Sequence, residues 1–233
     1  MRLVGIIGAM EEEVALMLKK MENPRTQRHG GALFHIGTLN GQAIVLLQSG
    51  IGKVNAAMAT ALLLELYQPD AVINTGSAGG VGEQLEIGDI VISTEVCHHD
   101  ADATAFGYVY GQIPQMPATY PADPSLCKVV ERAIATLGEA RVHHGLIASG
   151  DSFMADPERI MAVKSRFPAL LALEMEAAAI AQICYRYHTP FVVTRALSDI
   201  AGKESPISFP EFLEKAAVQS TLMVEALLGE LRD

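Results

Sequence analysis

The sequence contains few cysteines and few basic residues. Its three cysteines, Cys97, Cys127 and Cys184, are widely spaced and odd in number, so they fit neither a disulfide framework nor a CxxC metal motif. The 17 Lys and Arg residues are outnumbered by 27 Asp and Glu residues, which gives a net charge of −10. Without a basic stripe that could follow phosphates, binding to DNA or RNA is not expected.

Long apolar runs are also missing. The mean hydropathy is +0.25, yet no run approaches the ~18 residues that a membrane span requires. Polar residues interrupt the two most apolar stretches, 56–66 and 169–184. The first residues lack the basic start and the longer apolar region of a signal peptide. We therefore expect a soluble, cytoplasmic protein with no membrane partner.

What the sequence does contain is material for a buried core. Hydrophobic residues make up 50% and charged residues 19% of the chain, which excludes intrinsic disorder. At roughly 150 residues per domain, 233 residues correspond to one large domain or two small ones. No linker, internal repeat or low-complexity segment divides the chain, so we predict one domain over 1–233.

Apolar β-branched runs alternate with helical patterns along the chain, which predicts an α/β fold of three layers, with a central mixed sheet flanked by helices. Strands are predicted at 3–7, 33–39, 42–47, 71–74, 89–93, 144–148, 171–173 and 191–196. Helices are predicted from 10 to a stop at 23–24, then at 52–67, 125–137, 157–166, 176–187 and 209–231. The segment 98–124 is predicted to be a long functional or interface loop.

Small and polar residues follow the predicted strands. In open α/β sheets, ligands bind beyond the carboxyl ends of the strands. Those ends carry Ser, Asp, Glu and Arg at 8–11, 75–77, 149–151 and 195–199. Together with Phe153, Met175 and Glu176 they predict a pocket for a flat apolar base and a polyhydroxylated sugar.

Three glutamates, Glu11, Glu12 and Glu13, begin the first predicted helix. Acidic residues in a first turn favour the helix dipole, which explains most such runs. The apolar stripe directs Glu12 away from the core and leaves Glu11 and Glu13 beside it. Helical spacing alone leaves both the dipole role and a catalytic role open.

Three further segments match a known functional motif only in part. Residues 50–53 resemble a phosphate-binding loop, but the required Gly and Ser/Thr are replaced by Leu47 and Val54. The segment 75–79 lacks the first Gly of a nucleophile elbow and precedes poor helix formers, so a serine hydrolase is a weak alternative. The segment 98–102 holds two His and two Asp, and we interpret it as a polar loop because no second set of ligands completes a metal site.

Six ordered motifs that cover nearly the whole chain resemble the 5′-methylthioadenosine/S-adenosylhomocysteine nucleosidase family of the nucleoside phosphorylase superfamily. They occupy residues 6–13, 49–53, 74–80, 149–153, 174–176 and 198–199, and residues 105–108 also match. One departure is Gly202, where the family pattern has an acidic residue. The resemblance implies a nucleoside phosphorylase-like fold and irreversible hydrolysis of adenine nucleosides that carry a 5′-thioether.

The resemblance also implies the catalytic roles. Asp199 would be the general acid that protonates adenine N7, and it must hold its proton near neutral pH to do so. The sugar would gain oxocarbenium character, as in glycoside hydrolysis. Glu13 would hold and deprotonate the attacking water, with Ser77 and Arg195 positioning that water. Glu176 would bind the ribose hydroxyls, assisted by the backbone of Met175.

The remaining implied contacts concern the base and the thioether. Phe153 would stack on adenine and the backbone of Met154 would contact its Watson–Crick edge. The other substrate-binding residues on the base and sugar would be Ala78, Gly79 and Ser198. Met10, Ile51 and Phe209 would form the thioether slot, completed by Ala103, Phe106 and Pro114 of a neighbouring subunit. The chain is therefore expected to form a homodimer, with no metal and no organic cofactor.

Two alternatives remain beside this interpretation. A phosphorylase of the same superfamily would use phosphate in place of water, but a carboxylate at Glu13 would repel that dianion. Arg195 is nevertheless a basic group that a phosphorylase would also need. A non-catalytic nucleoside-binding module is disfavoured because Glu13, Glu176 and Asp199 are all present.

Overall fold

The computed structural model describes residues 1–138, 141–201 and 205–231, with the backbone alone over 205–211. Its centre is an 11-stranded sheet in the order β2-β3-β4-β1-β5-β11-β6-β10-β9-β7-β8. The strands are β1 Val4–Gly8, β2 Glu22–His29, β3 Ala32–Leu39, β4 Gln42–Gln48, β5 Ala71–Asn74, β6 Ser77–Gly80, β7 Ile90–His98, β8 Tyr120–Pro121, β9 Val142–Ser149, β10 Leu170–Glu174 and β11 Phe191–Ile200. Parallel and antiparallel pairs both occur, so the predicted mixed sheet is confirmed.

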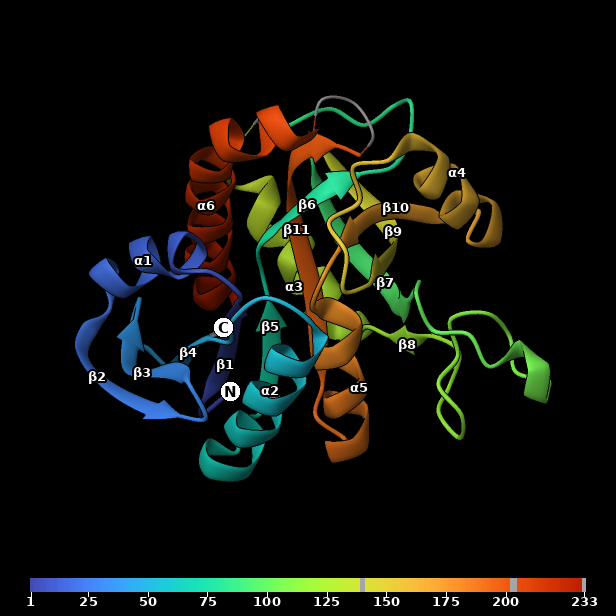
Figure 1. Ribbon diagram of the computed structural model, residues 1–233. Coiled ribbons are helices and arrows are strands. Elements are labelled where there is room, and N and C mark those ends of the chain that lie inside the picture. Colours follow the sequence, from blue (N-terminus) through green and yellow to red (C-terminus); the bar gives the residue numbers. More distant parts are fainter. Residues whose placement is uncertain (139–140, 202–204, 232–233) are drawn as a thin grey trace.

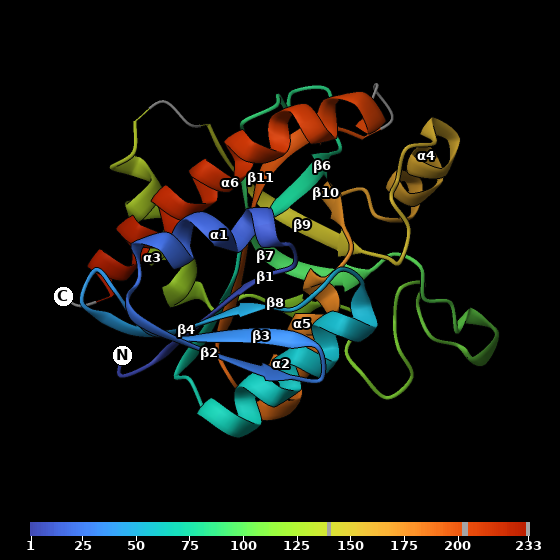
Figure 2. The ribbon, with the colours of Figure 1, turned by 60° about the vertical axis from the view of Figure 1, so that its left-hand side comes forward.

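Helices cover both faces of the sheet (Figure 2). They are α1 Glu11–Lys20, α2 Lys53–Tyr67, α3 Pro124–Ala135, α4 Pro157–Arg166, α5 Ala177–Tyr187 and α6 Ser205–Glu230. The helices α1, α3 and α6 lie on one face, α2 and α5 lie on the other, and α4 packs beside β9 and β10. Strand β1 is buried on both sides, with Ile6 in one core cluster and Ile7 in the other. Such two-sided burial explains its continuous apolar sequence.

Local sequence signals place several boundaries. Asp123 accepts hydrogen bonds from the amides of Ser125 and Leu126 at the start of α3, directly before Pro124. Asp156 caps α4 in the same way before Pro157. Asn40 and Gly41 both have positive φ, 50° and 72°, as a two-residue hairpin turn between β3 and β4 requires.

The strand β2 was not predicted from the sequence. Its residues are exposed or half-buried, and they lack the alternation of apolar and polar side chains that reveals most strands. Strand β2 pairs only with β3 among the described strands, so it forms the edge of the sheet, where such a polar sequence is tolerated. The glycine-rich strand β6 was missed for a related reason, since small residues carry little strand signal.

The last strand extends further than expected. Strand β11 continues from Phe191 to Ile200, whereas the prediction ended it at Ala196. It pairs with β5 and β6 in parallel and with β7 antiparallel. The strands β11, β6, β10, β9 and β7 therefore form a closed ring within the sheet. Its register with β6 shifts between Leu197 and Asp199. A bulge of this kind re-aims side chains, and here it lies where Asp199 enters the site.

The segment from 99 to 119 leaves the body of the molecule as a long excursion (Figure 1). It contains the short 3-10 helix Thr104–Phe106 and ends at β8. The prediction of a long loop at 98–124 is therefore largely confirmed. Among the described residues, no helix has both the length and the apolar character needed to cross a membrane.

Candidate active site

A cavity of about 280 Å³ opens at the carboxyl ends of β1, β10 and β11. Its lining comes from segments far apart in the sequence: Ala9, Met10, Glu13, Ile51, Ser77, Ala78, Gly79, Phe153, Leu173, Glu174, Met175, Glu176 and Asp199. An adjoining recess of about 30 Å³ adds Ser152, Met154 and Ala201. Three of the lining carboxylic acids, Glu13, Glu176 and Asp199, are nearly fully buried and were predicted as site residues.

Glu13 is held by four hydrogen-bond donors. Its Oε2 accepts from the amides of Ala9 at 2.8 Å and Met10 at 3.2 Å. Its Oε1 accepts from the amide of Ser77 at 3.0 Å and the Ser77 hydroxyl at 3.1 Å. Glu13 occupies the third position of α1 and reaches back to the residue before the helix, as in a capping box. The capping role and a place in the cavity thus coincide in one residue.

Gly76 permits this arrangement. A Cβ atom on Gly76 would lie 2.7 Å from Oε1 of Glu13, closer than atoms can approach. The Ser77 hydroxyl donates to Glu13, and Ser77 itself begins the strand β6. The segment 75–79 therefore forms no nucleophile elbow, which needs a helix after the serine.

Asp199 lies far from Glu13 in the sequence, near the end of β11, and is 2% exposed. Its Oδ1 accepts from the hydroxyl of Ser198 at 3.0 Å. A Cβ atom on Gly79 would come within 3.1 Å of its Oδ2, so the strand β6 closes against this carboxyl group. Ser198 thus contacts Asp199 directly, and Ala78 and Gly79 form the adjacent wall.

Glu176 forms the third acidic position, at the start of α5. Its Oε1 accepts from the amide of Gly52 at 2.7 Å. Burial raises the pKa of Glu176 to about 8, and the neighbouring Glu174 carboxylate adds to this increase. A pKa of about 8 favours the protonated form of Glu176 near neutral pH. Phe153 lines the same cavity and is 46% exposed, so its ring lies at the mouth.

Arg195 lies beneath the cavity rather than in its lining. Its guanidinium donates to Oε2 of Glu174 at 2.7 Å and to Oδ1 of Asn74 at 2.6 Å. Glu174 also accepts from the Ser149 hydroxyl and from the amides of Glu176 and Ala177. The guanidinium also donates to backbone carbonyl oxygens of Asn74 and Thr194. The predicted contact of Arg195 with the attacking water stays a prediction.

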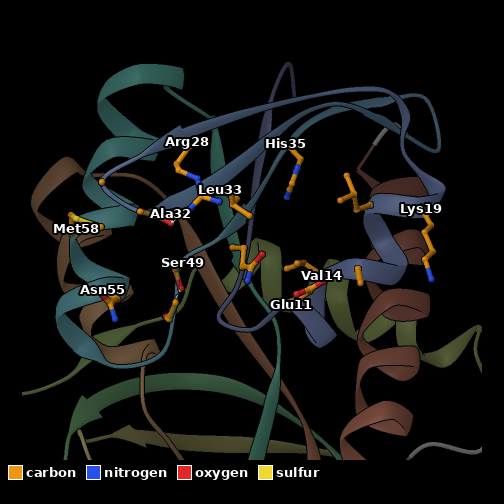
Figure 3. Close-up of a pocket in the computed structure, with 16 residues that line it drawn as sticks. Glu11, Val14, Lys19, Arg28, Ala32, Leu33, His35, Ser49, Asn55 and Met58 are labelled. Carbon is orange, nitrogen blue, oxygen red and sulfur yellow. Dashed lines mark hydrogen bonds between the residues drawn. The ribbon is translucent and has the colours of Figure 1, made fainter.

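A second and larger cavity, of about 710 Å³, lies between α1, α2 and the β2–β3 hairpin (Figure 3). Its lining includes Glu11, Lys19, Arg28 and His35. It does not contain Glu13, Glu176 or Asp199. The helix α1 thus sends Glu13 into the smaller cavity and Glu11 to the larger one, and a catalytic role for Glu13 stays a prediction.

The residues expected from a neighbouring subunit lie on the excursion. Ala103 is half-buried, Pro114 is exposed, and Phe106 is 83% exposed. They are outside the lining of the cavity within this chain. Phe209 falls in the part of α6 whose side chains are outside the described residues, and Gly202 is also outside them.

The segment 98–102 forms no metal cluster in the described part of the chain. His98 bonds through Nε2 to Oε1 of Gln182 at 2.9 Å. Asp100 pairs with Lys53, and Asp102 caps the turn at Thr104. His98, Asp100 and Asp102 therefore each have at least one hydrogen-bond or ion-pair partner within the fold.

Comparison with known proteins identifies the family of this chain. The family model described as "Phosphorylase superfamily" matches residues 3–229. The 5′-methylthioadenosine/S-adenosylhomocysteine nucleosidase of Chromohalobacter salexigens is 60% identical over 231 residues, 99% of this chain and 98% of that protein. The chain belongs to the 5′-methylthioadenosine/S-adenosylhomocysteine nucleosidase family. The resemblance inferred from the six motifs is thus confirmed.

Two crystal structures of nucleosidases from this family share the fold. The Neisseria meningitidis enzyme, in complex with methylthio-immucillin-A, has a TM-score of 0.95 and 48% identity, covering 97% of this chain and 98% of its own. The Colwellia psychrerythraea enzyme, in complex with adenine, has a TM-score of 0.96 and 49% identity, covering 99% of this chain and 96% of its own. The predicted nucleoside phosphorylase fold of this nucleosidase is therefore confirmed.

The sequence interpretation missed the buried layer below the cavity. Glu174, Asn74 and Ser149 connect there to Arg195. Glu174 was quoted only as part of the motif 174–176. The available signal was its position at the carboxyl end of a predicted strand, next to Glu176, where two carboxylates require a cation nearby.

Proposed function

We propose that this chain hydrolyses the N-glycosidic bond of 5′-methylthioadenosine and S-adenosylhomocysteine, with Asp199 as general acid and Glu13 as general base. The products are adenine and the ribose that carries the 5-thio substituent. The observation that carries the proposal is the convergence of two buried carboxylic acids, from the first helix and the last strand, on one cavity of about 280 Å³. The family relationship supplies the substrate class.

The leaving group sets the first requirement. Adenine leaves poorly as an anion, so N7 must receive a proton as the bond between C1′ and N9 breaks. Asp199 gives this proton, and the bonding electron pair remains on N9. Asp199 is 2% exposed, and this role requires its carboxyl group to carry a proton when the nucleoside binds. The Ser198 hydroxyl, which donates to Oδ1, fixes the carboxyl orientation.

The nucleophile sets the second requirement. As C1′ gains oxocarbenium character, a water must attack it and lose a proton. Glu13 takes this proton, and the oxygen of the water becomes the hydroxyl at C1′. The four donors on Glu13 hold its carboxylate in place and reduce the reorganisation needed during the reaction. A phosphate dianion at the same position would be repelled by this carboxylate.

The remaining contacts orient the nucleoside. Glu176 binds the ribose hydroxyls beside the Met175 backbone, and Phe153 stacks on adenine while the Met154 backbone contacts the edge of the base. Met10 and Ile51, which both line the cavity, contact the thioether. Arg195 acts through Glu174, since its guanidinium is bound to that carboxylate.

We further propose a homodimer in which Ala103, Phe106 and Pro114 complete the thioether slot of the partner subunit. Large apolar side chains are exposed on the excursion and near the cavity mouth: Ile51 at 50%, Val54 at 78%, Phe106 at 83% and Val109 at 57%. Such clusters are typical of association surfaces. Phe106→Ala should raise KM for the thioether substrates more than it weakens adenine binding. A fully active monomer in sedimentation would contradict the dimer proposal.

The proposed activity is tested by supplying 5′-methylthioadenosine in buffer without phosphate and measuring the release of adenine. Turnover should occur and should not increase when phosphate is added. A strict requirement for phosphate, with a sugar 1-phosphate as product, would identify a phosphorylase instead. Binding of the nucleoside without turnover would identify a non-catalytic module.

A further inference from the structure

Lys53, Asp100 and Asp151 form a closed cycle of hydrogen bonds, and Lys53 and Asp151 lie two residues from Ile51 and Phe153 of the cavity lining. The Lys53 amide donates to Oδ1 of Asp151 at 2.7 Å. The Asp151 amide donates to Oδ2 of Asp100 at 3.0 Å. Oδ1 of Asp100 in turn pairs with Nζ of Lys53 at 2.5 Å. Each residue therefore bonds to both of the others, although they are far apart in the sequence.

The cycle joins three segments that serve the site. Lys53 begins α2 and follows Gly52, whose amide donates to Glu176 at 2.7 Å. Asp151 lies two residues before Phe153, at the mouth of the cavity. Asp100 stands at the start of the excursion that carries Phe106. The cycle thus connects the three segments that carry proposed contacts to the ribose, to adenine and to the thioether.

Charge and packing both favour a fixed geometry. The side chains of Lys53 and Asp100 are 19% and 32% exposed, so water screens the pair only in part. Burial acts to raise the pKa of Asp100, but the hydrogen bonds from Lys53 and from the Asp151 amide outweigh it, and the pKa is lowered. Below the cycle, a Cβ atom on Gly150 would lie 2.4 Å from the His99 ring, which leaves this segment little freedom to shift.

Gly52 shows how tightly the segments fit. Its φ is +94°, a conformation that favours glycine, and a Cβ atom there would lie 3.1 Å from Oδ1 of Asp151. Asp151 therefore packs closely against the segment whose amide donates to Glu176. Asp100 accepts from the Asp151 amide, and Asp151 accepts from the Lys53 amide next to Gly52. Loss of the Asp100 carboxylate should therefore make the Gly52 amide, which donates to Glu176, less well fixed.

We propose that Lys53 and Asp100 are positioning residues, which hold the Gly52 amide and the start of the excursion in the geometry that binds the ribose and its 5′ substituent. This inference rests on the proposed nucleosidase activity. Neither side chain contacts the reacting atoms in the proposal. Their effect is therefore expected in substrate affinity, through Glu176 and the thioether slot, more than in the chemical step.

The test compares Asp100→Asn and Lys53→Met with Lys53→Arg, which keeps the charge, and with Lys20→Gln as matched control. Lys20 pairs with Glu225 at the same distance of 2.5 Å, but between α1 and α6. The first two variants should raise KM for 5′-methylthioadenosine about tenfold, within the ~10²-fold cost that misplacement can carry. Their kcat should change less, and Lys53→Arg and Lys20→Gln should stay near the parent values.

A second readout does not depend on the substrate. Amide hydrogen exchange over residues 50–54 should become about tenfold faster in Asp100→Asn and Lys53→Met, but not in Lys20→Gln, because opening of the cycle exposes these amides. Unchanged exchange and unchanged KM would overturn the positioning role. So would equal losses of kcat and global stability without a KM change. Absence of turnover in the parent protein would refute the proposed activity, whereas the exchange result would still decide whether the cycle fixes this segment.

Discussion

Ser77 is bonded twice to the same oxygen of Glu13, through its amide at 3.0 Å and its hydroxyl at 3.1 Å. The two residues come from α1 and β6, which are 64 positions apart in the chain. This double contact fixes the carboxylate from the side of the cavity, while the amides of Ala9 and Met10 hold its other oxygen. The proposed base is thus oriented by groups that cannot themselves accept the proton of water.

Glu13→Gln should lower kcat by ~10²–10⁴-fold with a smaller change in KM, because an amide can hold a water but cannot take its proton. Glu12→Gln and Glu11→Gln are matched controls on the same helix. Glu12 is exposed and Glu11 lines the larger cavity, so each should cost only a few tenths of a kcal/mol through the helix dipole. Steady-state kinetics on 5′-methylthioadenosine would contradict the assignment if Glu11→Gln were inactive and Glu13→Gln normal.

Gly76→Ala should reduce activity strongly, because the new Cβ would lie 2.7 Å from Oε1 of Glu13 and displace the carboxylate. Gly229→Ala is the control, since nothing lies within 4 Å of a Cβ there and the residue is in α6. That change should stabilise the protein by roughly 0.5–1 kcal/mol through helix propensity. Kinetics and urea unfolding together test both variants; full activity of Gly76→Ala would show that Glu13 does not need this position.

Arg195→Met should destabilise the protein by about 3–5 kcal/mol, because it leaves the buried Glu174 carboxylate without its cation. Both side chains are nearly inaccessible, at 2% and 3% exposure. Arg132→Gln is the comparison, since its pair with Glu230 is largely exposed and should contribute at most ~1 kcal/mol. Urea unfolding at pH 7 measures both. Equal losses of unfolding free energy in the two variants would mean that the pair of Arg195 and Glu174 stabilises the protein no more than an exposed ion pair does.

The raised pKa of Glu176 should appear in the pH dependence of stability. The folded protein binds this proton more tightly than the unfolded chain, whose pKa lies near the ordinary value of 4.5. The stabilising contribution is therefore complete below about 4.5 and is lost as pH rises through about 8. Within that window Glu176 should lower the unfolding free energy by at most ~1.4 kcal/mol per pH unit.

Glu176→Gln should remove this part of the slope, and Glu12→Gln should retain it. Urea unfolding without ligand, at several pH values from 5 to 9, provides the measurement. The same slope in Glu176→Gln and in the parent protein would show that another group is responsible.

The sequence predicted the parts of the molecule that depend on local patterns. Buried strands such as β1 and β5, the turn at Asn40–Gly41 and the helix α4 were placed closely because apolar runs, turn residues and capping residues are local signals. The edge strand β2 was missed because its polar sequence has no such signal, and pairing with β3 alone specifies it.

The same distinction holds for the site. The motifs identified Glu13, Glu176 and Asp199, and the fold brings all three to one cavity. The choice between Glu11 and Glu13 needed the packing of α1 against the sheet, which helical spacing cannot supply. The cycle of Lys53, Asp100 and Asp151 depends on three segments that meet only in the folded chain, so nothing in the sequence around any one of these residues indicates it.

The central claim is that Asp199 activates the leaving group and Glu13 activates the water. The most direct test compares two substrates, 5′-methylthioadenosine and a 5-methylthio-riboside of 4-nitrophenol, whose anion leaves without protonation. Asp199→Asn should lose at least ~10²-fold in kcat/KM on the first substrate and little on the second. Glu13→Gln should lose activity on both. If Asp199→Asn loses the two activities equally, or if Glu13→Gln retains them, the assignment of acid and base is wrong.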